Sequence, residues 1–284
     1  MRFLITGAKG QLARAFIGTF QDTHHTAIAP DEEGLDICHL NSVLDAISEH
    51  EPDVVLNCAA YNWVDKAEED FDAAFQANAE GVKNLALACK KHRALLVHFG
   101  TDYVFDGTKE DFYSEEDEPN PINNYGKSKL LGEKFLVEGT DDFLLFRVSW
   151  VYGEGRQNFL YKLSQWAEKN KVLRVVCDQT SVPTFAEDIA QFTRLAVENG
   201  VRGIYHFTNG GYASRFEVAR YFIERLGLDR LILPVTSDYF PAPAKRPRFS
   251  AMSNGKISRA LDLDIPDWKS GIDRFIENIL GRIG

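Results

Sequence analysis

The chain opens with Met1-Arg2-Phe3-Leu4-Ile5-Thr6-Gly7-Ala8-Lys9-Gly10-Gln11-Leu12-Ala13. A short apolar run ends in a glycine-rich turn, and apolar residues then recur with helical spacing. This order predicts a buried strand, a tight turn and an amphipathic helix. Such a turn lets backbone amides approach a pyrophosphate, and the helix N-terminus adds partial positive charge. The stretch therefore favours a dinucleotide-binding fold over a plain strand-turn-helix unit.

The rest of the chain repeats this alternation. We expect strands near residues 3–6, 26–29, 54–58, 95–100, 143–149 and 172–176, with amphipathic stretches between them. That order predicts an α/β fold with a doubly wound parallel sheet of the Rossmann type. After residue 177 the elements become shorter and richer in loops. We expect a cofactor-binding domain over 1–177 and a smaller C-terminal substrate lobe over 178–284, some segments of which return to the main domain.

Bulk properties narrow the class of protein. The 284 residues carry a formal net charge of -10 without a basic stripe, which argues against a nucleic-acid partner. No apolar run reaches the length that spans a bilayer, and the first strand starts at Met1, leaving no room for a signal peptide. The four cysteines have neither paired nor metal-type spacing. We expect a cytoplasmic protein without a membrane partner.

Acidic and small residues follow the next predicted strands. Asp31 could accept a hydrogen bond from a ribose hydroxyl, and Asp36 could bond the adenine amino group. No arginine follows the second strand closely, which favours NADH or use of both cofactors. The strand over 54–58 ends in small residues, Ala59 among them, beside which a cofactor can pass. Because ligands bind at the carboxyl ends of parallel strands, these residues should converge there.

Tyr125 and Lys129 are four residues apart, so a helix places them on one face. A phenol has a pKa of about 10, and a neighbouring ammonium should lower it toward neutrality. Thr101, at the end of another predicted strand, could hydrogen-bond the group being protonated. The trio is suited to adding or removing a proton at a carbonyl or alcohol oxygen. The spacing alone is also typical of a solvated surface pair, so the glycine turn is what makes it informative.

With these residues in place, the sequence resembles the dTDP-4-dehydrorhamnose reductases, a family of extended short-chain dehydrogenases/reductases. The resemblance runs nearly end to end. Its most specific parts are Thr101-Asp102-Tyr103-Val104-Phe105-Asp106-Gly107 and Arg246-Pro247. Further matching stretches cover residues 7–12, 57–68, 125–133 and 147–153.

The resemblance implies an NAD(P)H-dependent oxidoreductase that reduces the C4 ketone of dTDP-4-dehydro-L-rhamnose to dTDP-L-rhamnose. Such an enzyme serves dTDP-rhamnose biosynthesis and hence cell-surface polysaccharide such as lipopolysaccharide. The nicotinamide would give the hydride and Tyr125 the proton. Lys129 would lower the tyrosine pKa and hold the nicotinamide ribose, and Thr101 would position the reacting oxygen.

Together, the patterns and the resemblance assign two sets of binding residues beside the catalytic trio. The cofactor set, for NADPH or NADH, is Gly7, Lys9, Gly10, Gln11, Leu12, Asp31, Asp36, Ile37, Ala59, Ala60, Tyr61, Asn62, Tyr125 and Lys129. The substrate set is Thr101, Tyr103, Val104, Phe105, Trp150, Asn158 and Arg246. Arg246 could grip a diphosphate through its planar fork, or form a surface salt bridge instead. Trp150 could pack on the sugar, or be a core aromatic.

Departures from the family pattern limit what carries over. Ala13 replaces the third glycine of the turn, and Tyr61 and Asn62 stand where histidine and threonine are common. Some members dimerise through a magnesium site that uses a glutamate where this chain has Ala15. We therefore predict no metal and leave a homodimer open.

Two other functions remain compatible with the sequence. One is a reductase or 4-epimerase of another nucleotide sugar, and an epimerase would hold NAD tightly through purification. The other is a non-catalytic NAD(P)-binding protein, like the regulatory subunit of methionine adenosyltransferase. The presence of Thr101, Tyr125 and Lys129 speaks against lost catalysis.

Overall fold

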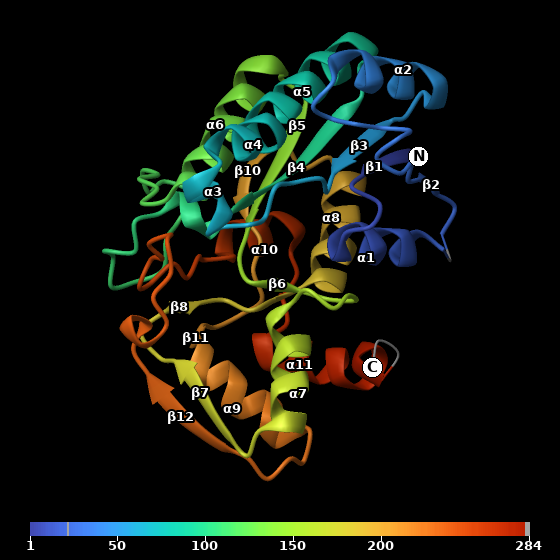
Figure 1. Cartoon of the computed structure of the whole chain (residues 1–284). Helices are drawn as coiled ribbons and strands as arrows, with labels where there is room; N and C mark the ends of the chain where they lie inside the picture. The colour runs from blue at the N-terminus through green and yellow to red at the C-terminus, as the bar shows by residue number, and fades with distance from the viewer. Residues whose placement is uncertain (22, 282–284) are drawn as a thin grey trace.

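A computed structural model describes residues 1–21 and 23–281. The main sheet has six strands in the order β10-β5-β4-β3-β1-β2, and every pair is parallel (Figure 1). Its strands are β1 (Arg2–Thr6), β2 (Thr26–Ile28), β3 (Val54–Asn57), β4 (Leu95–Thr101), β5 (Phe143–Val148) and β10 (Gly203–His206). The predicted doubly wound α/β sheet is confirmed.

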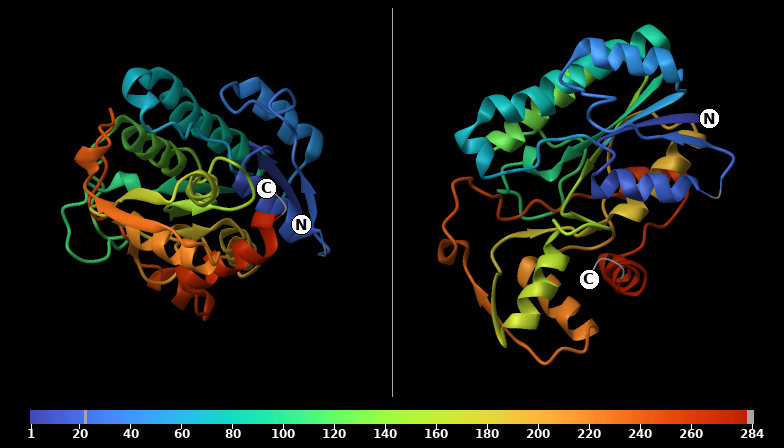
Figure 2. Two further views of the ribbon diagram at one scale, coloured as in Figure 1. Left: turned by 60° about the horizontal axis from the view of Figure 1, so that its bottom comes forward. Right: turned by 45° about the vertical axis from the view of Figure 1, so that its right-hand side comes forward.

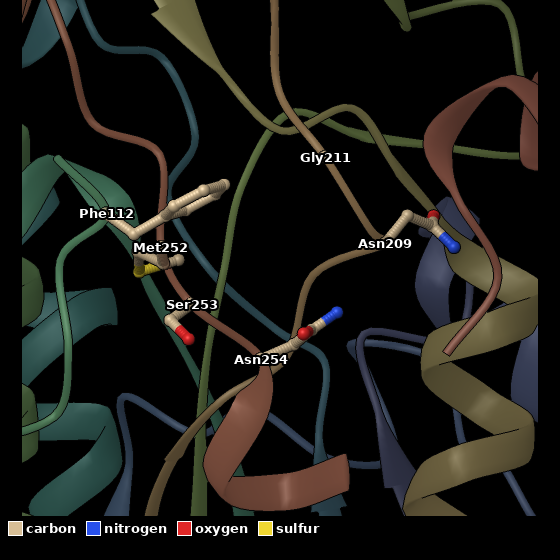
Figure 3. Close-up of a pocket in the computed structure, with 6 residues that line it drawn as sticks. All are labelled: Phe112, Asn209, Gly211, Met252, Ser253 and Asn254. Carbon is tan, nitrogen blue, oxygen red and sulfur yellow. The ribbon is translucent and has the colours of Figure 1, made fainter. Parts of the chain in front are cut away.

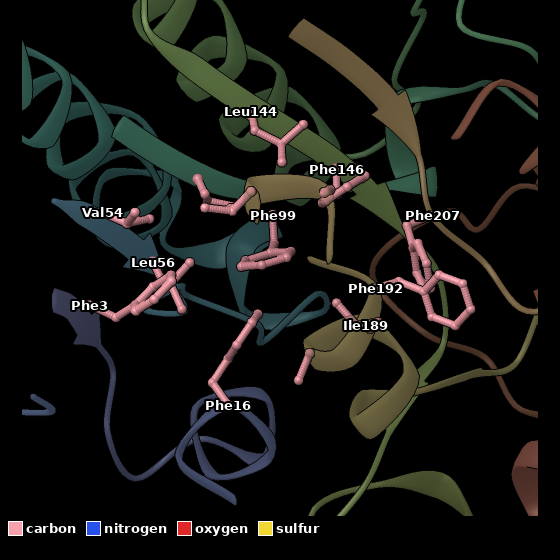
Figure 4. Close-up of a cluster of buried hydrophobic side chains, with 14 of the residues drawn as sticks. Phe3, Phe16, Val54, Leu56, Phe99, Leu144, Phe146, Ile189, Phe192 and Phe207 are labelled. Carbon is pink, nitrogen blue, oxygen red and sulfur yellow. The ribbon is translucent and has the colours of Figure 1, made fainter. Parts of the chain in front are cut away.

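Helices cover both faces of this sheet (Figure 2). One face carries α2 (Leu40–His50), α5 (Gly81–His92) and α6 (Asn124–Gly139), and the other carries α1 (Gln11–Phe20), α8 (Ala186–Glu198) and α10 (Gly255–Leu261). Alternate residues of one strand enter opposite cores. Phe99 packs with Phe16 and Ile189, as Figure 4 shows, whereas Leu96 of the same strand belongs to the other core. Burial on both faces explains the nearly continuous apolar runs of the sequence.

The remaining elements of the main domain are short and lie on the α5 and α6 side. They are α3 (Lys66–Glu69), α4 (Phe71–Phe75), the π-helical turn η1 (Gln76–Glu80) and the 3-10 turn η2 (Asp102–Val104).

A smaller lobe packs below the sheet in Figure 1. Its buried cluster joins helices and short strands from the second half of the chain. These elements are β6 (Val151–Tyr152), α7 (Phe159–Lys169), β7 (Val172–Val176), β8 (Thr180–Ser181), β9 (Thr184–Phe185), β11 (Ala213–Ser214), α9 (Arg215–Arg225), β12 (Leu231–Val235), η3 (Ser237–Tyr239), α11 (Trp268–Phe275) and η4 (Ile276–Leu280).

One strand was assigned to the wrong sheet. The segment 172–176 forms β7, which pairs with β12 in the smaller lobe, and the sixth strand of the main sheet is β10. The burial pattern of β7 fits this position. β7 alternates exposed and buried residues, as expected for a strand covered on one face, whereas a central strand of the main sheet such as β4 is buried on both faces. β10 and α8, from the second half of the chain, belong to the main sheet and to the helices that cover it. The division at residue 177 stays a prediction, with β7 moved to the lobe.

In the part of the chain that the structure describes, no helix is both long enough and apolar enough to cross a membrane.

Candidate active site at the carboxyl edge of the sheet

The loops after β1 and β3 touch each other at the carboxyl edge. Gly7 has a φ of 65°, and a Cβ added there would lie 2.8 Å from the Cα of Ala59. The Thr6 hydroxyl accepts a hydrogen bond of 3.0 Å from the Ala59 amide and donates one of 2.7 Å to Asn57. Only glycine combines this backbone conformation with so close an approach. The structure therefore brings Gly7 and Ala59 together as predicted.

The first turn of α1 is open to an anion. Gly10 is its N-cap and offers no side-chain cap, and the turn carries no acidic residue. Because the first amides of a helix lack intrahelical partners, these donors are available to a pyrophosphate. Gln11 donates 2.9 Å to the Val151 carbonyl, while among the described residues its buried Oε1 has no donor. The residues present thus fit a dinucleotide, and Ala13 packs in the core without closing the turn.

The two predicted adenosine-side carboxylates are engaged locally. Asp31 accepts 3.1 Å from the Gly34 amide in an exposed turn. Asp36 accepts 2.9 Å from the Cys38 amide, and its second oxygen lies 3.5 Å from His39. Ile37 is buried in the core beside them. Their cofactor contacts stay a prediction.

The predicted catalytic trio meets at the end of β4. Tyr125 and Lys129 lie in α6, whose N-cap Asn123 accepts 2.7 Å from the Gly126 amide. Both side chains are buried. The Lys129 ammonium donates 2.6 Å to the Phe99 carbonyl, and the Thr101 hydroxyl lies beside Tyr125.

The loop after β3 closes over the trio. The Tyr125 hydroxyl donates 3.3 Å to Asn62, so this departure from the family pattern touches the proposed proton donor. The Tyr61 backbone is fixed at both ends by Asn78, which accepts from its amide at 2.9 Å and donates to its carbonyl at 3.0 Å.

The expected lowering of the tyrosine pKa is wrong for the protein without bound cofactor. Burial raises the pKa of Tyr125 above its usual value, and the neighbouring Thr101 hydroxyl only opposes that rise. Burial also lowers the pKa of Lys129 to about 8, while nearby Glu133 raises it. The lysine points to Phe99, which explains why its charge does not offset the desolvation of the phenol. A neutral phenol is the protonation state that a proton donor needs.

Two arginines converge on Tyr103, which packs edge-on against Tyr125 with ring centres 5.9 Å apart. Arg246 forms a two-pronged ion pair with Asp65 at 3.0 and 2.7 Å, and its guanidinium also lies beside the Tyr103 phenol. The Arg215 guanidinium lies beside the same phenol. The salt bridge expected as the alternative for Arg246 is therefore present, and its contact with a diphosphate stays a prediction.

Trp150 lies against Arg215, whose guanidinium is 3.9 Å from the ring centre. The tryptophan is partly buried and has a φ of 40°. A cation over an indole face makes a rigid surface on which a sugar can pack.

The other predicted substrate residues serve the fold with their side chains. Val104 and Phe105 are fully buried with Tyr113 and Met252, which leaves only their backbone for a substrate. Asn158 is the N-cap of α7, accepts from the Tyr161 amide and donates to the carbonyls of residues 153 and 155. Its local sequence resembles a helix start, which is the role that the structure gives it.

Sequence reasoning missed Arg215 and Asp102. Ser214 and Glu217 form a capping box, a readable signal that Arg215 opens a helix. Nothing in the local sequence indicates that its guanidinium meets Trp150 and Tyr103, because both contacts join distant segments.

A cavity of about 130 Å³ is lined by residues outside the predicted site (Figure 3). Its lining residues are Phe112, Asn209, Gly211, Met252, Ser253 and Asn254, and none is a predicted site residue. Its two amides already bond Asp188 and the Thr208 carbonyl. Among residues 1–21 and 23–281, no three His, Cys, Asp or Glu side chains lie together as metal ligands. The expected lack of a metal stays a prediction.

Comparisons with known proteins identify the family. The family described as "RmlD substrate binding domain" matches residues 1–280. A dTDP-4-dehydrorhamnose reductase of Burkholderia thailandensis is 35% identical over 99% of this chain and 100% of its own. Among solved structures, one such reductase from Clostridium acetobutylicum is 36% identical with a TM-score of 0.94, covering 98% of this chain and 99% of the other. One from Bacillus anthracis, in complex with NADP, is 34% identical with a TM-score of 0.95 at the same coverage. The chain therefore belongs to the dTDP-4-dehydrorhamnose reductase family of NAD(P)H-dependent oxidoreductases.

Proposed function

We propose that this protein reduces the C4 ketone of dTDP-4-dehydro-L-rhamnose to dTDP-L-rhamnose with NADPH or NADH. The observation that carries the proposal is a buried, neutral Tyr125 beside Thr101, at the edge where Gly7 and an uncapped helix meet. Close relatives with the same reductase activity in their names support the choice of substrate.

The protein's own residues supply the proton. When bound, the reduced nicotinamide supplies the hydride for the sugar C4. As negative charge develops on the C4 oxygen, the Tyr125 O–H protonates it, exchanging its bond to Asn62 for one to the substrate. The buried Lys129 cation then stabilises the phenolate, since charges interact more strongly in a water-poor site.

The side of the site proposed for the substrate is cationic. Arg215 and Arg246 would face the diphosphate from two segments of the smaller lobe, and Trp150 would pack against the sugar. The cofactor side is proposed to use the glycine turn, the first amides of α1 and the loop over 59–62, with Asp31 and Asp36 toward the adenosine. A cytoplasmic location and a role in dTDP-rhamnose and cell-surface polysaccharide biosynthesis go with this activity. Neither a nucleic-acid nor a membrane partner is proposed, and a homodimer remains a prediction for size-exclusion chromatography with light scattering.

Transfer of deuterium from NADPH labelled at the nicotinamide C4 tests this function. We expect one deuterium at C4 of the rhamnose product, seen by NMR, for each NADPH oxidised. An epimerase would consume no NADPH overall, and a regulatory binding protein would bind NADPH without releasing any sugar product. Either result would contradict the proposal.

A further inference from the structure

Asp102 connects the end of β4 to the smaller lobe. Its side chain is buried, and its two oxygens face different partners. Oδ1 accepts 3.2 Å from the Thr101 hydroxyl. Oδ2 accepts 2.8 Å from Ser181 and 2.6 Å from Ser250. One carboxylate thus joins the catalytic threonine to two serines that lie 79 and 148 residues further along the chain.

The two serines lie in a group of hydrogen-bonded segments that also contains Arg215 and Arg246. The Thr180 amide donates 2.7 Å to the Arg248 carbonyl, and the Ser250 amide donates 2.9 Å to the Thr180 carbonyl. On its other side β8 pairs with β11, and Arg215 follows β11 directly. We call residues 180–181, 213–215 and 246–250 the substrate platform. Asp102 is therefore bonded to the same unit that holds Arg215 and Arg246.

The contact with Thr101 fixes the direction of one proton. A threonine hydroxyl has a single hydrogen to donate and two lone pairs. The Thr101 oxygen accepts 3.2 Å from the Tyr103 amide. When its hydrogen points to Asp102, one lone pair remains on the Thr101 oxygen, which can then accept a hydrogen bond but cannot donate one. The carboxylate thereby determines whether Thr101 acts as an acceptor or as a donor toward the groups beside it.

We infer that Asp102 is a positioning residue: it holds the hydrogen of the Thr101 hydroxyl, so that the Thr101 oxygen faces the site as an acceptor, and it does so through a carboxylate held in place by the substrate platform. Binding of the diphosphate by the arginines and alignment of the proton donor are then coupled through one buried side chain. This inference rests on the proposed reductase activity and adds a residue that acts on the chemistry through Thr101.

Opposing effects set the pKa of Asp102. Burial raises the pKa of Asp102 to about 6, whereas the hydroxyls of Ser250, Ser181 and Thr101 and the Arg215 guanidinium lower it. The phenols of Tyr103 and Tyr125 are the other titratable groups that face it. At neutral pH the carboxylate is ionised and accepts all three hydroxyl hydrogens. Below about pH 6 it becomes protonated, and its hold on Thr101 weakens.

The test compares Asp102→Asn and the double variant Ser181→Ala/Ser250→Ala with the wild-type protein. Because hydrogen bonds to charged groups contribute about 1.5–3 kcal/mol, we expect kcat to fall about 10- to 100-fold in Asp102→Asn. NADPH affinity, from nicotinamide fluorescence, and the KM for the sugar should change less than about threefold, because Asp102 is not among the residues proposed to hold either ligand. Wild-type kcat should fall below about pH 6, and Asp102→Asn should lose that limb. The double variant keeps the carboxylate and should lose part of kcat.

Ser164→Ala is the matched control, because Ser164 is also a buried serine that donates a hydrogen bond, to the Tyr161 carbonyl within α7. It should behave like the wild type. Wild-type kcat together with a retained acidic limb in Asp102→Asn would overturn the inference. A lower kcat, weaker NADPH binding and a higher KM, all changed by a similar factor, would also overturn it, since such a result indicates general damage to the fold. Should Asp102→Asn fail to fold by circular dichroism, an unchanged kcat in the double variant would overturn it. A wild-type protein without turnover contradicts the proposed function instead.

Discussion

The Lys129 ammonium donates a hydrogen bond of 2.6 Å to the carbonyl oxygen of Phe99. The lysine is therefore anchored on β4, two residues before Thr101, rather than on the phenol one turn away in its own helix. This anchor fixes α6 against the strand that delivers Thr101. It also keeps a cation buried beside the site, where burial lowers its pKa to about 8.

An alkaline limb in kcat/KM should report this lysine. Because the charged form of Lys129 is lost as pH rises through about 8, kcat/KM should fall above that pH. The profile can be measured from initial rates of NADPH oxidation. In Lys129→Met the activity should be low and the limb absent, and NADPH should bind more weakly. If Lys129→Met kept an alkaline limb at the same pH, the limb would belong to a group other than Lys129.

Tyr125→Phe separates proton donation from binding. Loss of a general acid typically costs about 10²- to 10⁴-fold in rate, so kcat should fall by that amount. The ring should keep its packing against Tyr103, and dTDP and NADPH affinities measured by calorimetry should stay near wild type. A variant that retains more than about half of wild-type kcat would exclude Tyr125 as the proton donor.

Arg215 should matter for the nucleotide sugar and not for the dinucleotide. Replacing it with methionine keeps an apolar stem over Trp150 and removes the charge, so the KM for the sugar should rise about 10- to 100-fold. NADPH binding should be unchanged. Arg220→Met, an exposed change on the same helix, is the control and should leave both values alone. Equal KM values for the two variants would remove Arg215 from the substrate site.

Gly7→Ala should damage the glycine turn. A φ of 65° is costly for alanine by about 1–2 kcal/mol, and the added Cβ would meet Ala59 at 2.8 Å. We expect a lower unfolding temperature and weaker NADPH binding. Gly18→Ala, in the exposed last turn of α1, has no atom within 4 Å of the added Cβ and should stabilise by up to about 1 kcal/mol. Similar unfolding temperatures for both variants would show that the turn tolerates a side chain.

Much of the fold could be read from the sequence because it depends on local signals. The glycine turn and the buried strands, such as Val54–Asn57, can each be recognised from a few consecutive residues. The strand with which a given strand pairs cannot be recognised in this way. Val172–Val176 has strand character wherever it lies, and only tertiary packing sends it to β12.

The site, like the fold, could be predicted only as far as local sequence patterns reach. Helical spacing places Tyr125 and Lys129 together, but the direction of the tyrosine pKa shift follows from burial, which no spacing encodes. Arg215 and Asp102 act through contacts between segments far apart in the chain, so their roles became visible only in the folded structure.

Oxidation of NADPH or NADH by dTDP-4-dehydro-L-rhamnose, prepared enzymatically, tests the central claim most directly. The account predicts that the wild-type protein oxidises one or both cofactors in step with formation of dTDP-L-rhamnose, and that Tyr125→Phe does so at least about 100-fold more slowly. Absence of turnover by the folded wild-type protein with both cofactors would contradict it.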